Sequence, residues 1–324
     1  MENSFKWRIV KEMANYGFGL DLGGTTCKCG LFTAAGELLE KWEVPTDTSN
    51  GGVNILKDLA QTVVKKMEEK NITSDDVLGV GIGIPGPVSD DGVVNRCVNL
   101  GWGVFNVEKE FSECLGGIKV KAGNDANVAA LGESWMGAAK EYSSSVMVTL
   151  GTGVGGGVIL NDDIIPGAHG AAGEIGHIRV NYTEENTCGC GNHGCLEQYC
   201  SATGIARLAK IRLAQNDDES TLRDVETLDA KAVFDEAKKG DTVAKEIAKR
   251  ACEYLAQGLQ VISCVVNPEA FVIGGGVSKA GQYLVDEVEY RFNQIAFHGC
   301  RNTKIVLASL GNDAGIYGAM KLIL

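Results

Sequence analysis

Three cysteines and a histidine lie within one short segment of the chain. The segment reads Cys188-Gly-Cys190-Gly-Asn-His193-Gly-Cys195. Thiol and imidazole groups at this spacing are typical of a structural Zn²⁺ site with three cysteine ligands and one histidine. A disulfide is a poor alternative, because Cys188 and Cys190 are too close to bridge easily and no signal-peptide pattern indicates an oxidising compartment. His177 competes with His193 as fourth ligand, and the spacing leaves both open.

Two glycine-rich turns could bind phosphate. They are Asp21-Leu-Gly23-Gly24-Thr25-Thr26 and Gly151-Thr152-Gly153. Successive backbone N–H groups in such turns form nests that attract anions, and the threonine hydroxyls could add hydrogen bonds. Asp21 could hold a phosphate-bound Mg²⁺ through water. Either turn alone is more simply a type I′ hairpin turn, but two turns flanked by threonines favour nucleotide phosphates.

Two common nucleotide motifs do not account for these turns. Residues 151–156 match the pattern GxGxxG, yet residues 158–162 continue as a strand, whereas the dinucleotide motif requires a helix there. The Walker A sequence Gly-Lys-Ser/Thr does not occur. The phosphate hypothesis therefore depends on the turns themselves.

Acidic residues near these motifs are candidates for acid–base chemistry or ligand binding. In Gly123-Asn124-Asp125-Ala126-Asn127, the residues alone favour Asp125 as the N-cap of a following helix. The chemical alternative is a general base, because ligands of open α/β sheets bind beyond the carboxyl ends of the strands. The cysteine segment is flanked by Glu174, His177 and Glu197. The proximity of these residues in the sequence predicts a shared pocket.

The elements that must position these residues form an α/β pattern with two similar halves. Residues 16–32 and 145–160 each predict a strand, a glycine turn and a second strand, which suggests two related halves. Other expected strands are 77–84, 118–122 and 270–273, and expected helices are 52–70, 123–139, 242–266 and 312–324. Residues 161–200 should be irregular, and 215–240 should form solvated helix faces.

The domain organisation follows from this pattern. We expect an N-terminal extension at 1–15, an α/β domain at 16–122 closed by helix 312–324, and a second α/β domain at 123–311 that carries the zinc motif at 177–195. In helix 52–70, Val53, Leu56, Leu59 and Val63 should form the buried face. The eight cysteines outside the cluster, such as Cys27 and Cys264, should be small core residues.

Composition and charge exclude several classes of protein. Of 324 residues, 43 are glycine and five are proline, which fits tight turns rather than disorder. The net charge of −12, without a dense lysine or arginine run, argues against nucleic-acid binding. No apolar run approaches the ~18 residues of a membrane-spanning helix, so we expect no membrane partner. We expect a cytoplasmic location.

Eight motifs in one order resemble the ROK family (repressor, open reading frame, kinase), most closely its bacterial glucokinases. The resemblance covers residues 16–324. The motifs are Asp21-Leu-Gly-Gly-Thr-Thr, Gly83-Ile-Pro-Gly86, Gly123-Asn124-Asp125-Ala126-Asn127, Leu150-Gly-Thr-Gly-Val-Gly-Gly, Gly173-Glu174-Ile-Gly-His177, Cys188-x-Cys190-Gly-x-x-Gly-Cys195-Leu-Glu197, Ser201-Ala-Thr-Gly-Ile205 and Ile273-Gly-Gly-Gly-Val277.

The resemblance implies an actin-like, ribonuclease-H-like fold of two α/β domains, with ATP, Mg²⁺ and a sugar as ligands. Asp125 becomes the general base for the sugar 6-hydroxyl, and the implied sugar contacts are Gly86, Asn124, Asp125, Glu174, His177 and Glu197. The implied ATP contacts are Asp21, Gly23, Gly24, Thr25, Thr26, Lys28, Gly151, Thr152, Gly153, Gly274, Gly275 and Gly276. The implied ligands of a structural Zn²⁺ are His177, Cys188, Cys190 and Cys195.

The activity that the resemblance implies is ATP-dependent phosphorylation of glucose. N-acetylmannosamine, mannose, fructose and allose remain alternative substrates, and polyphosphate an alternative donor. A sugar-sensing repressor of this family is a weaker hypothesis, because such proteins carry a helix-turn-helix domain in front and only about 15 residues precede the first expected strand. The resemblance also implies a homodimer.

Overall fold

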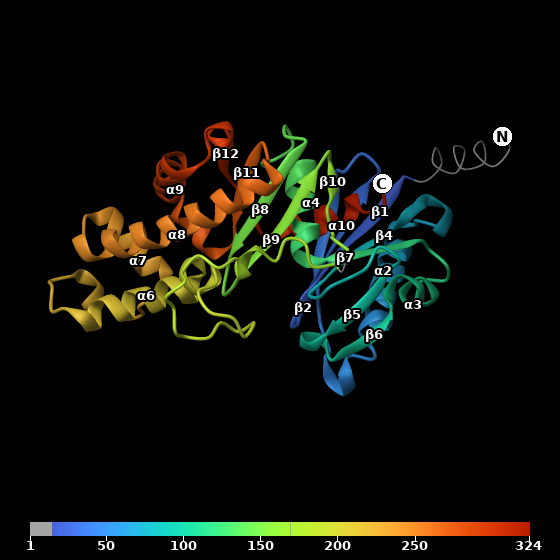
Figure 1. Ribbon diagram of the computed structural model, residues 1–324. Coiled ribbons are helices and arrows are strands. Elements are labelled where there is room, and N and C mark those ends of the chain that lie inside the picture. The colour runs from blue at the N-terminus through green and yellow to red at the C-terminus, as the bar shows by residue number, and fades with distance from the viewer. Residues whose placement is uncertain (1–14, 169) are drawn as a thin grey trace. The chain divides into compact units, whose positions relative to one another are not determined.

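The structure is a computed structural model that describes residues 15–168 and 170–324 (Figure 1). The described chain forms two compact units. Unit 1 holds the residues up to Lys140 together with Asp163–Ala172 and Asn312–Leu324, and unit 2 holds Glu141–Asp162 and Gly173–Gly311. The expected extension at residues 1–15 lies, except for Asn15, outside the described residues.

Unit 1 is built on a five-stranded mixed sheet in the order β3-β2-β1-β4-β7. The strands are β1 (Tyr16–Leu22), β2 (Thr26–Thr33), β3 (Leu38–Pro45), β4 (Val77–Ile84) and β7 (Val120–Asn124). β1 and β2 form an antiparallel hairpin, and β1, β4 and β7 run parallel. A separate antiparallel pair consists of β5 (Val93–Cys97) and β6 (Trp102–Asn106).

Helices cover both faces of this sheet. The helices of unit 1 are α2 (Ile55–Lys70), α3 (Val107–Cys114), α4 (Asp125–Met136) and α10 (Ala314–Lys321). Apolar residues of α2 and α3, among them Leu59 and Phe111, belong to the main core together with the strands. On the α10 side, a Cβ at Gly19 or Gly81 would collide with backbone carbonyls of α10. Glycine therefore lets this helix lie directly on the sheet.

α4 and α10 pack against each other through small residues. A Cβ at Gly132 would collide with the carbonyl of Ala314, and a Cβ at Gly318 would collide with that of Val128. Because the two backbones approach so closely, residues 123–140 group with unit 1, whereas the sequence predicted that the second domain begins at residue 123.

Unit 2 repeats the strand arrangement of unit 1. Four strands lie in the order β9-β8-β11-β12, with β8 and β9 as an antiparallel hairpin and β8, β11 and β12 parallel. Their bounds are β8 (Ser144–Leu150), β9 (Val154–Leu160), β11 (Ala270–Gly274) and β12 (Lys304–Leu307). The short strand β10 (Asp163–Ile164), which follows β9 in the chain, belongs to the residues of unit 1. The helices are α5 (Glu197–Cys200), α6 (Ala202–Gln215), α7 (Ala230–Lys239), α8 (Thr242–Val266) and α9 (Gln282–Ile295). A hairpin beside two parallel strands in both units is the actin-like architecture that the motifs predicted.

Most expected elements are confirmed, with three corrections. Val53 is 72% exposed, because it lies in the turn before α2 rather than on the helix. Cys264 is exposed on α8 and Cys114 is exposed at the end of α3, so these two cysteines are not core residues. In the stretch 215–240, α7 is the only α-helix that begins there, and residues 216–229 form none. Within the described residues, no helix has the length and apolar composition needed to cross a membrane.

Candidate active site and metal centre

Four side chains of unit 2 form a cluster with the geometry of a metal centre. Ligand atoms of His177, Cys188, Cys190 and Cys195 all lie within 4.8 Å of one another. The sulfurs of Cys190 and Cys195 are 3.7 Å apart, and Cys188 Sγ lies 3.9 Å from His177 Nδ1. Tetrahedral zinc with Zn–S bonds of about 2.3 Å would hold two sulfurs about 3.8 Å apart. The donor set therefore fits Zn²⁺, while the exposed His193 lies outside the cluster.

The three thiols of the cluster differ in how readily they lose a proton when no metal ion is bound. Burial raises the pKa of Cys195 to about 12 and also raises the pKa of Cys188. A hydrogen bond from the backbone of Asn192 lowers the pKa of Cys190. A metal ion would keep the two buried sulfurs deprotonated at neutral pH, and four protein ligands would leave it no open position for substrate.

The backbone of the cysteine loop is fixed by the protein itself. Gln198 Oε1 accepts hydrogen bonds from the N–H groups of Gly194 (2.8 Å) and Cys195 (3.0 Å), and its Nε2 donates to the carbonyl of Asn186 (2.9 Å). Gly194 has a φ of +75°, and a Cβ there would collide with the carbonyl of Asn181. This glycine is thus required by the path of the loop.

Two carboxylates adjoin the cluster. His177 Nε2, the ring nitrogen that is not aimed at the thiols, lies 3.9 Å from Glu174 Oε2. Glu197 Oε1 lies 3.8 Å from Cys188 Sγ, and its Oε2 accepts a hydrogen bond from the Val154 N–H at 3.0 Å. The structure therefore brings Glu174, His177 and Glu197 together, and Glu197 also contacts the start of β9.

The second glycine turn lies beside a third glycine segment. Gly151, Thr152 and Gly153 follow β8. In the neighbouring parallel strand β11, Gly274 is the last residue, and Gly275 and Gly276 follow it. Gly275 has a φ of +83°, and a Cβ there would collide with the backbone of Leu150. Both segments thus meet at the carboxyl edge of one sheet, where α/β proteins place ligands.

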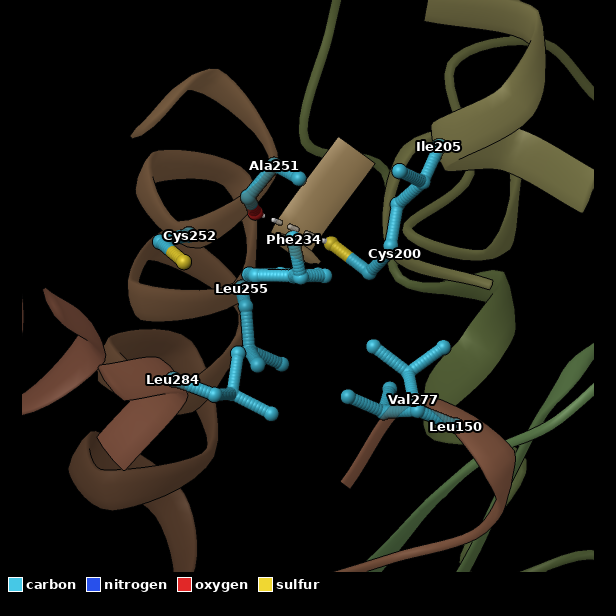
Figure 2. Close-up of a pocket in the computed structure, with 9 residues that line it drawn as sticks. All are labelled: Leu150, Cys200, Ile205, Phe234, Ala251, Cys252, Leu255, Val277 and Leu284. Carbon is cyan, nitrogen blue, oxygen red and sulfur yellow. Dashed lines mark hydrogen bonds between the residues drawn. The ribbon is translucent and has the colours of Figure 1, made fainter. Parts of the chain in front are cut away.

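An apolar cavity beneath this edge is too small to be the ligand site. Figure 2 shows Cys200 and Ile205 on one side and Leu150 and Val277 on another, with Leu255 and other residues of α8 opposite. The cavity measures about 10 Å³, and the Cys200 thiol donates to the carbonyl of Ala251 across 3.4 Å. Small-molecule pockets span roughly 300–1,000 Å³, so this space belongs to the core of unit 2.

The first glycine turn places an acidic group at the start of α10. Asp21 lies near Lys28, with 3.9 Å between Oδ2 and Nζ, and Lys28 also donates to the carbonyl of Asn312 (3.3 Å). Burial raises the pKa of Asp21, and the positive charge of Lys28 partly opposes this shift. A Cβ at Gly315 would collide with the Asp21 carboxylate. The first turn of α10 therefore lies against that carboxylate, where the helix dipole favours negative charge.

Asn124, not Asp125, caps α4. Asn124 Oδ1 accepts hydrogen bonds from the N–H groups of Ala126 (3.0 Å) and Asn127 (3.2 Å). Asp125 is the first residue of the helix, and one of its oxygens accepts from the Ala126 N–H at 2.8 Å. The N-cap role expected for Asp125 is thus wrong, because the preceding amide performs it.

Asn124 also connects α4 to the turn after β4. Its Nδ2 donates to the carbonyl of Gly86 at 3.2 Å. Since β4 and β7 are parallel neighbours with Ile84 opposite Asn124, Gly86, Asn124 and the half-buried Asp125 lie at one edge of the unit 1 sheet.

The β5–β6 hairpin, which was not predicted from the sequence, supports this edge. The Cys97 thiol donates to the carbonyl of Pro85 at 3.0 Å, and a Cβ at Gly86 would lie 3.3 Å from the Cys97 Cβ. Arg96, just before it, has a φ of +57°. The turn signal Asn99-Leu-Gly101 between Val94 and Trp102 could have indicated this hairpin.

The predicted site residues form one group in each unit. Asp21, Lys28, Gly86, Asn124 and Asp125 lie at the carboxyl edge of the unit 1 strands or in the adjoining hairpin. The metal cluster and the glycine turns of β8 and β11 lie in unit 2. Two actin-like α/β units are the architecture that the motifs predicted, and one unit carries Asp21 and Asp125 while the other carries the thiol cluster. The ROK family model matches residues 17–324, and the chain belongs to this family.

Known proteins are similar over nearly the whole chain. The glucokinase of Halalkalibacterium halodurans is 39% identical over 310 residues, with 94% of each chain covered. An N-acetyl-D-glucosamine kinase of Mannheimia succiniciproducens is 29% identical, with 95% of this chain and 99% of that protein covered. A crystal structure of a ROK family glucokinase from Streptomyces griseus in complex with glucose and AMPPNP has a TM-score of 0.74 and 31% identity, covering 95% and 98% of the two chains.

Proposed function

We propose that this protein is an ATP-dependent glucokinase that transfers the γ-phosphoryl group of ATP to the 6-hydroxyl of glucose. The observation that carries the choice of glucose is the 39% identity with a glucokinase across 94% of both chains. The alternative within the same reaction class is another hexose, and the similarity to an N-acetyl-D-glucosamine kinase specifically favours that amino sugar as the runner-up.

Asp125 is the general base in this proposal. It lies at the first position of α4, directly after a parallel strand, and is half-buried. Phosphoryl transfer depends mainly on positioning and charge stabilisation, so a carboxylate that accepts the hydroxyl proton as the phosphoryl group moves is sufficient. Asn124 supports this role, because its amide fixes both the start of α4 and the Gly86 turn.

The sugar contacts are proposed for Gly86, Asn124, Glu174, His177 and Glu197. Each polar group that loses its sugar hydroxyl would be left without a partner at a cost of roughly 1–3 kcal/mol, which gives a basis for discrimination among hexoses. Zn²⁺ on His177 and the three cysteines would supply structure rather than chemistry. By fixing the imidazole through Nδ1, it would leave Nε2 to face Glu174 and the sugar.

The nucleotide contacts are proposed for the three glycine turns. Their N–H groups would bind phosphate oxygens, with Asp21 holding Mg²⁺ through water and Lys28 adding positive charge. Gly274–Gly276 would lie near the adenosine. A cytoplasmic location and a homodimer remain part of the proposal, and light scattering on purified protein would test the latter.

The proposal is tested by ADP release with ATP, Mg²⁺ and a panel of sugars. The panel contains glucose, N-acetylglucosamine, N-acetylmannosamine, mannose, fructose and allose, with polyphosphate as a second donor. We expect kcat/KM for glucose to exceed the others at least tenfold. A tenfold preference for another sugar would overturn glucose but keep the kinase, and no turnover by folded, zinc-loaded protein would favour a sugar sensor.

A further inference from the structure

The first glycine turn accepts two hydrogen bonds from a threonine that follows the edge strand β3. Thr46 Oγ1 donates a hydrogen bond to the carbonyl of Gly23 at 2.8 Å, and the Thr46 N–H donates to the carbonyl of Thr25, also at 2.8 Å. The Gly23 N–H closes the turn by donating to the carbonyl of Thr26 (2.9 Å). Within the described residues, the N–H groups of Gly24 and Thr25 have no protein acceptor.

The second glycine turn is held in the same way by the start of α6. Thr203 Oγ1 donates to the carbonyl of Thr152 at 2.7 Å, and the N–H of Ala202 donates to the carbonyl of Gly151 at 2.8 Å. The Gly153 carbonyl accepts from the Gly151 N–H at 3.0 Å. In the part of the chain that the structure describes, the N–H groups of Thr152 and Gly153 have no protein acceptor.

The start of α6 is itself anchored in two ways. Ser201 Oγ donates to the carbonyl of Glu197 (2.7 Å) and accepts from the N–H of Gly204 (2.9 Å), which fixes the first turn of α6. Cys200 and Ile205, on either side of Ser201 in the sequence, point into the apolar core beside Leu150 (Figure 2). The position of Thr203 relative to the turn is therefore fixed by the start of α6.

The two arrangements have a common physical consequence. A carbonyl oxygen that faced a phosphate would repel it, whereas neighbouring N–H groups attract it. In both turns, a threonine hydroxyl and a backbone N–H bind carbonyls, and two consecutive N–H groups remain for a ligand. Because Thr46 and Thr203 come from unrelated segments of separate units, the repetition is not a by-product of one local fold.

We propose that Thr46 and Thr203 are positioning residues that hold the turn carbonyls away from the nucleotide phosphates and keep the turn N–H groups directed toward them. This inference rests on the proposed function, because the ligand of both turns is taken to be ATP. Neither residue is among those predicted as ligands, and each acts through the turn rather than on the phosphate.

The test compares nucleotide and sugar affinity in valine variants. Thr203→Val and Thr46→Val remove one hydroxyl hydrogen bond each, and we expect the Kd for AMPPNP to rise about three- to tenfold. The Kd for glucose should stay within about twofold, as measured by calorimetry on zinc-loaded protein. Thr203→Ser and Thr46→Ser keep the hydroxyl and should restore nucleotide affinity.

Thr221→Val is the matched control. It removes a hydroxyl that donates to Glu236 Oε2 at 2.6 Å in unit 2, away from the turns, and both affinities should be unchanged. Wild-type affinity for AMPPNP in both valine variants would overturn the inference while leaving the kinase proposal intact. A parallel loss of glucose affinity, or of folded protein in the serine variants as well, would assign the threonines to general stability and also overturn it. Failure of the wild type to bind AMPPNP would instead refute the proposed function.

Discussion

A side chain at Gly153 should destabilise the protein, because Glu197 occupies the space beside this glycine. A Cβ at this position would collide with Glu197 Oε2, the atom that accepts the hydrogen bond from the Val154 N–H at 3.0 Å. The steric cost itself is small, since the end of a glutamate side chain can move. Movement nevertheless breaks the hydrogen bond and leaves the N–H at the buried start of β9 without its acceptor.

The size of the effect can be worked out against a control in the same turn. A Cβ at Gly151 would meet no heavy atom within 4 Å, so Gly151→Ala changes only the backbone entropy. That term is common to both alanine variants and cancels in their difference. A hydrogen bond to a charged group contributes about 1.5–3 kcal/mol, and half-burial of Glu197 places it at about 1.5–2 kcal/mol.

The assay is thermal unfolding of zinc-loaded Gly153→Ala and Gly151→Ala, followed by circular dichroism. With about 2–4 °C of Tm per kcal/mol for a unit of this size, Gly153→Ala should melt about 3–8 °C below Gly151→Ala. Amide exchange at Val154 should accelerate only in the Gly153 variant. Melting temperatures within about 1 °C of each other, with equal protection of Val154, would show that the bond from Val154 to Glu197 does not account for the effect of a Cβ at Gly153.

Three further predictions concern the proposed base, the metal centre and an ion pair. Asp125→Asn should lower kcat roughly 10²–10⁴-fold with a glucose Kd near the wild-type value, and steady-state activity within twofold of the wild type would remove Asp125 from this role. Cys190→Ser should lose bound zinc and folded yield, measured by elemental analysis, whereas Cys114→Ser, at an exposed site outside the cluster, should retain both. Burial raises the pKa of Glu184, but hydrogen bonds from Arg207, Tyr199 and Asn186 outweigh it and lower the pKa from 4.5 to about 2. Glu184→Gln should therefore destabilise the protein by about 1–3 kcal/mol above pH 4.5. This difference should disappear as the pH falls toward 2, because the wild-type carboxylate is then protonated. A difference in unfolding midpoint that does not change with pH would contradict the role of the Glu184 carboxylate.

The sequence was most informative where interacting residues are close together in the chain. The hairpins that turn at residues 23–25 and 151–153 follow from apolar runs broken by glycine, and α8 matches its expected range of 242–266. The three cysteines of the metal cluster lie in one loop, so their chemistry was apparent from spacing. The fourth ligand was not, because His177 reaches the cluster through the fold of the intervening loop.

Local sequence reasoning failed where a neighbour in space decides the outcome. Asn124 and Asp125 are both good N-caps by residue type. Asn124 takes this role, and its amide also donates to the Gly86 carbonyl, 38 residues earlier in the chain. Val53 fits the helical periodicity but precedes the helix. The bonds from Thr46 and Thr203 to the turns join segments separated by 23 and 51 residues, a pairing that no periodicity records.

The position of α10 has a consequence for how the chain is made. Strand β1 is complete once residue 22 has been synthesised, but α10, whose backbone lies on Gly19 and Gly81, begins at residue 314. At about 5–20 residues per second, roughly 15–60 s of translation separate the two. During that time the part of the unit 1 sheet around Gly19 and Gly81 lacks the helix that covers it, whereas every strand and helix described for unit 2 is made before α10 begins. We therefore expect unit 2 to fold first during synthesis, and unit 1 to complete its fold only after α10 has been made.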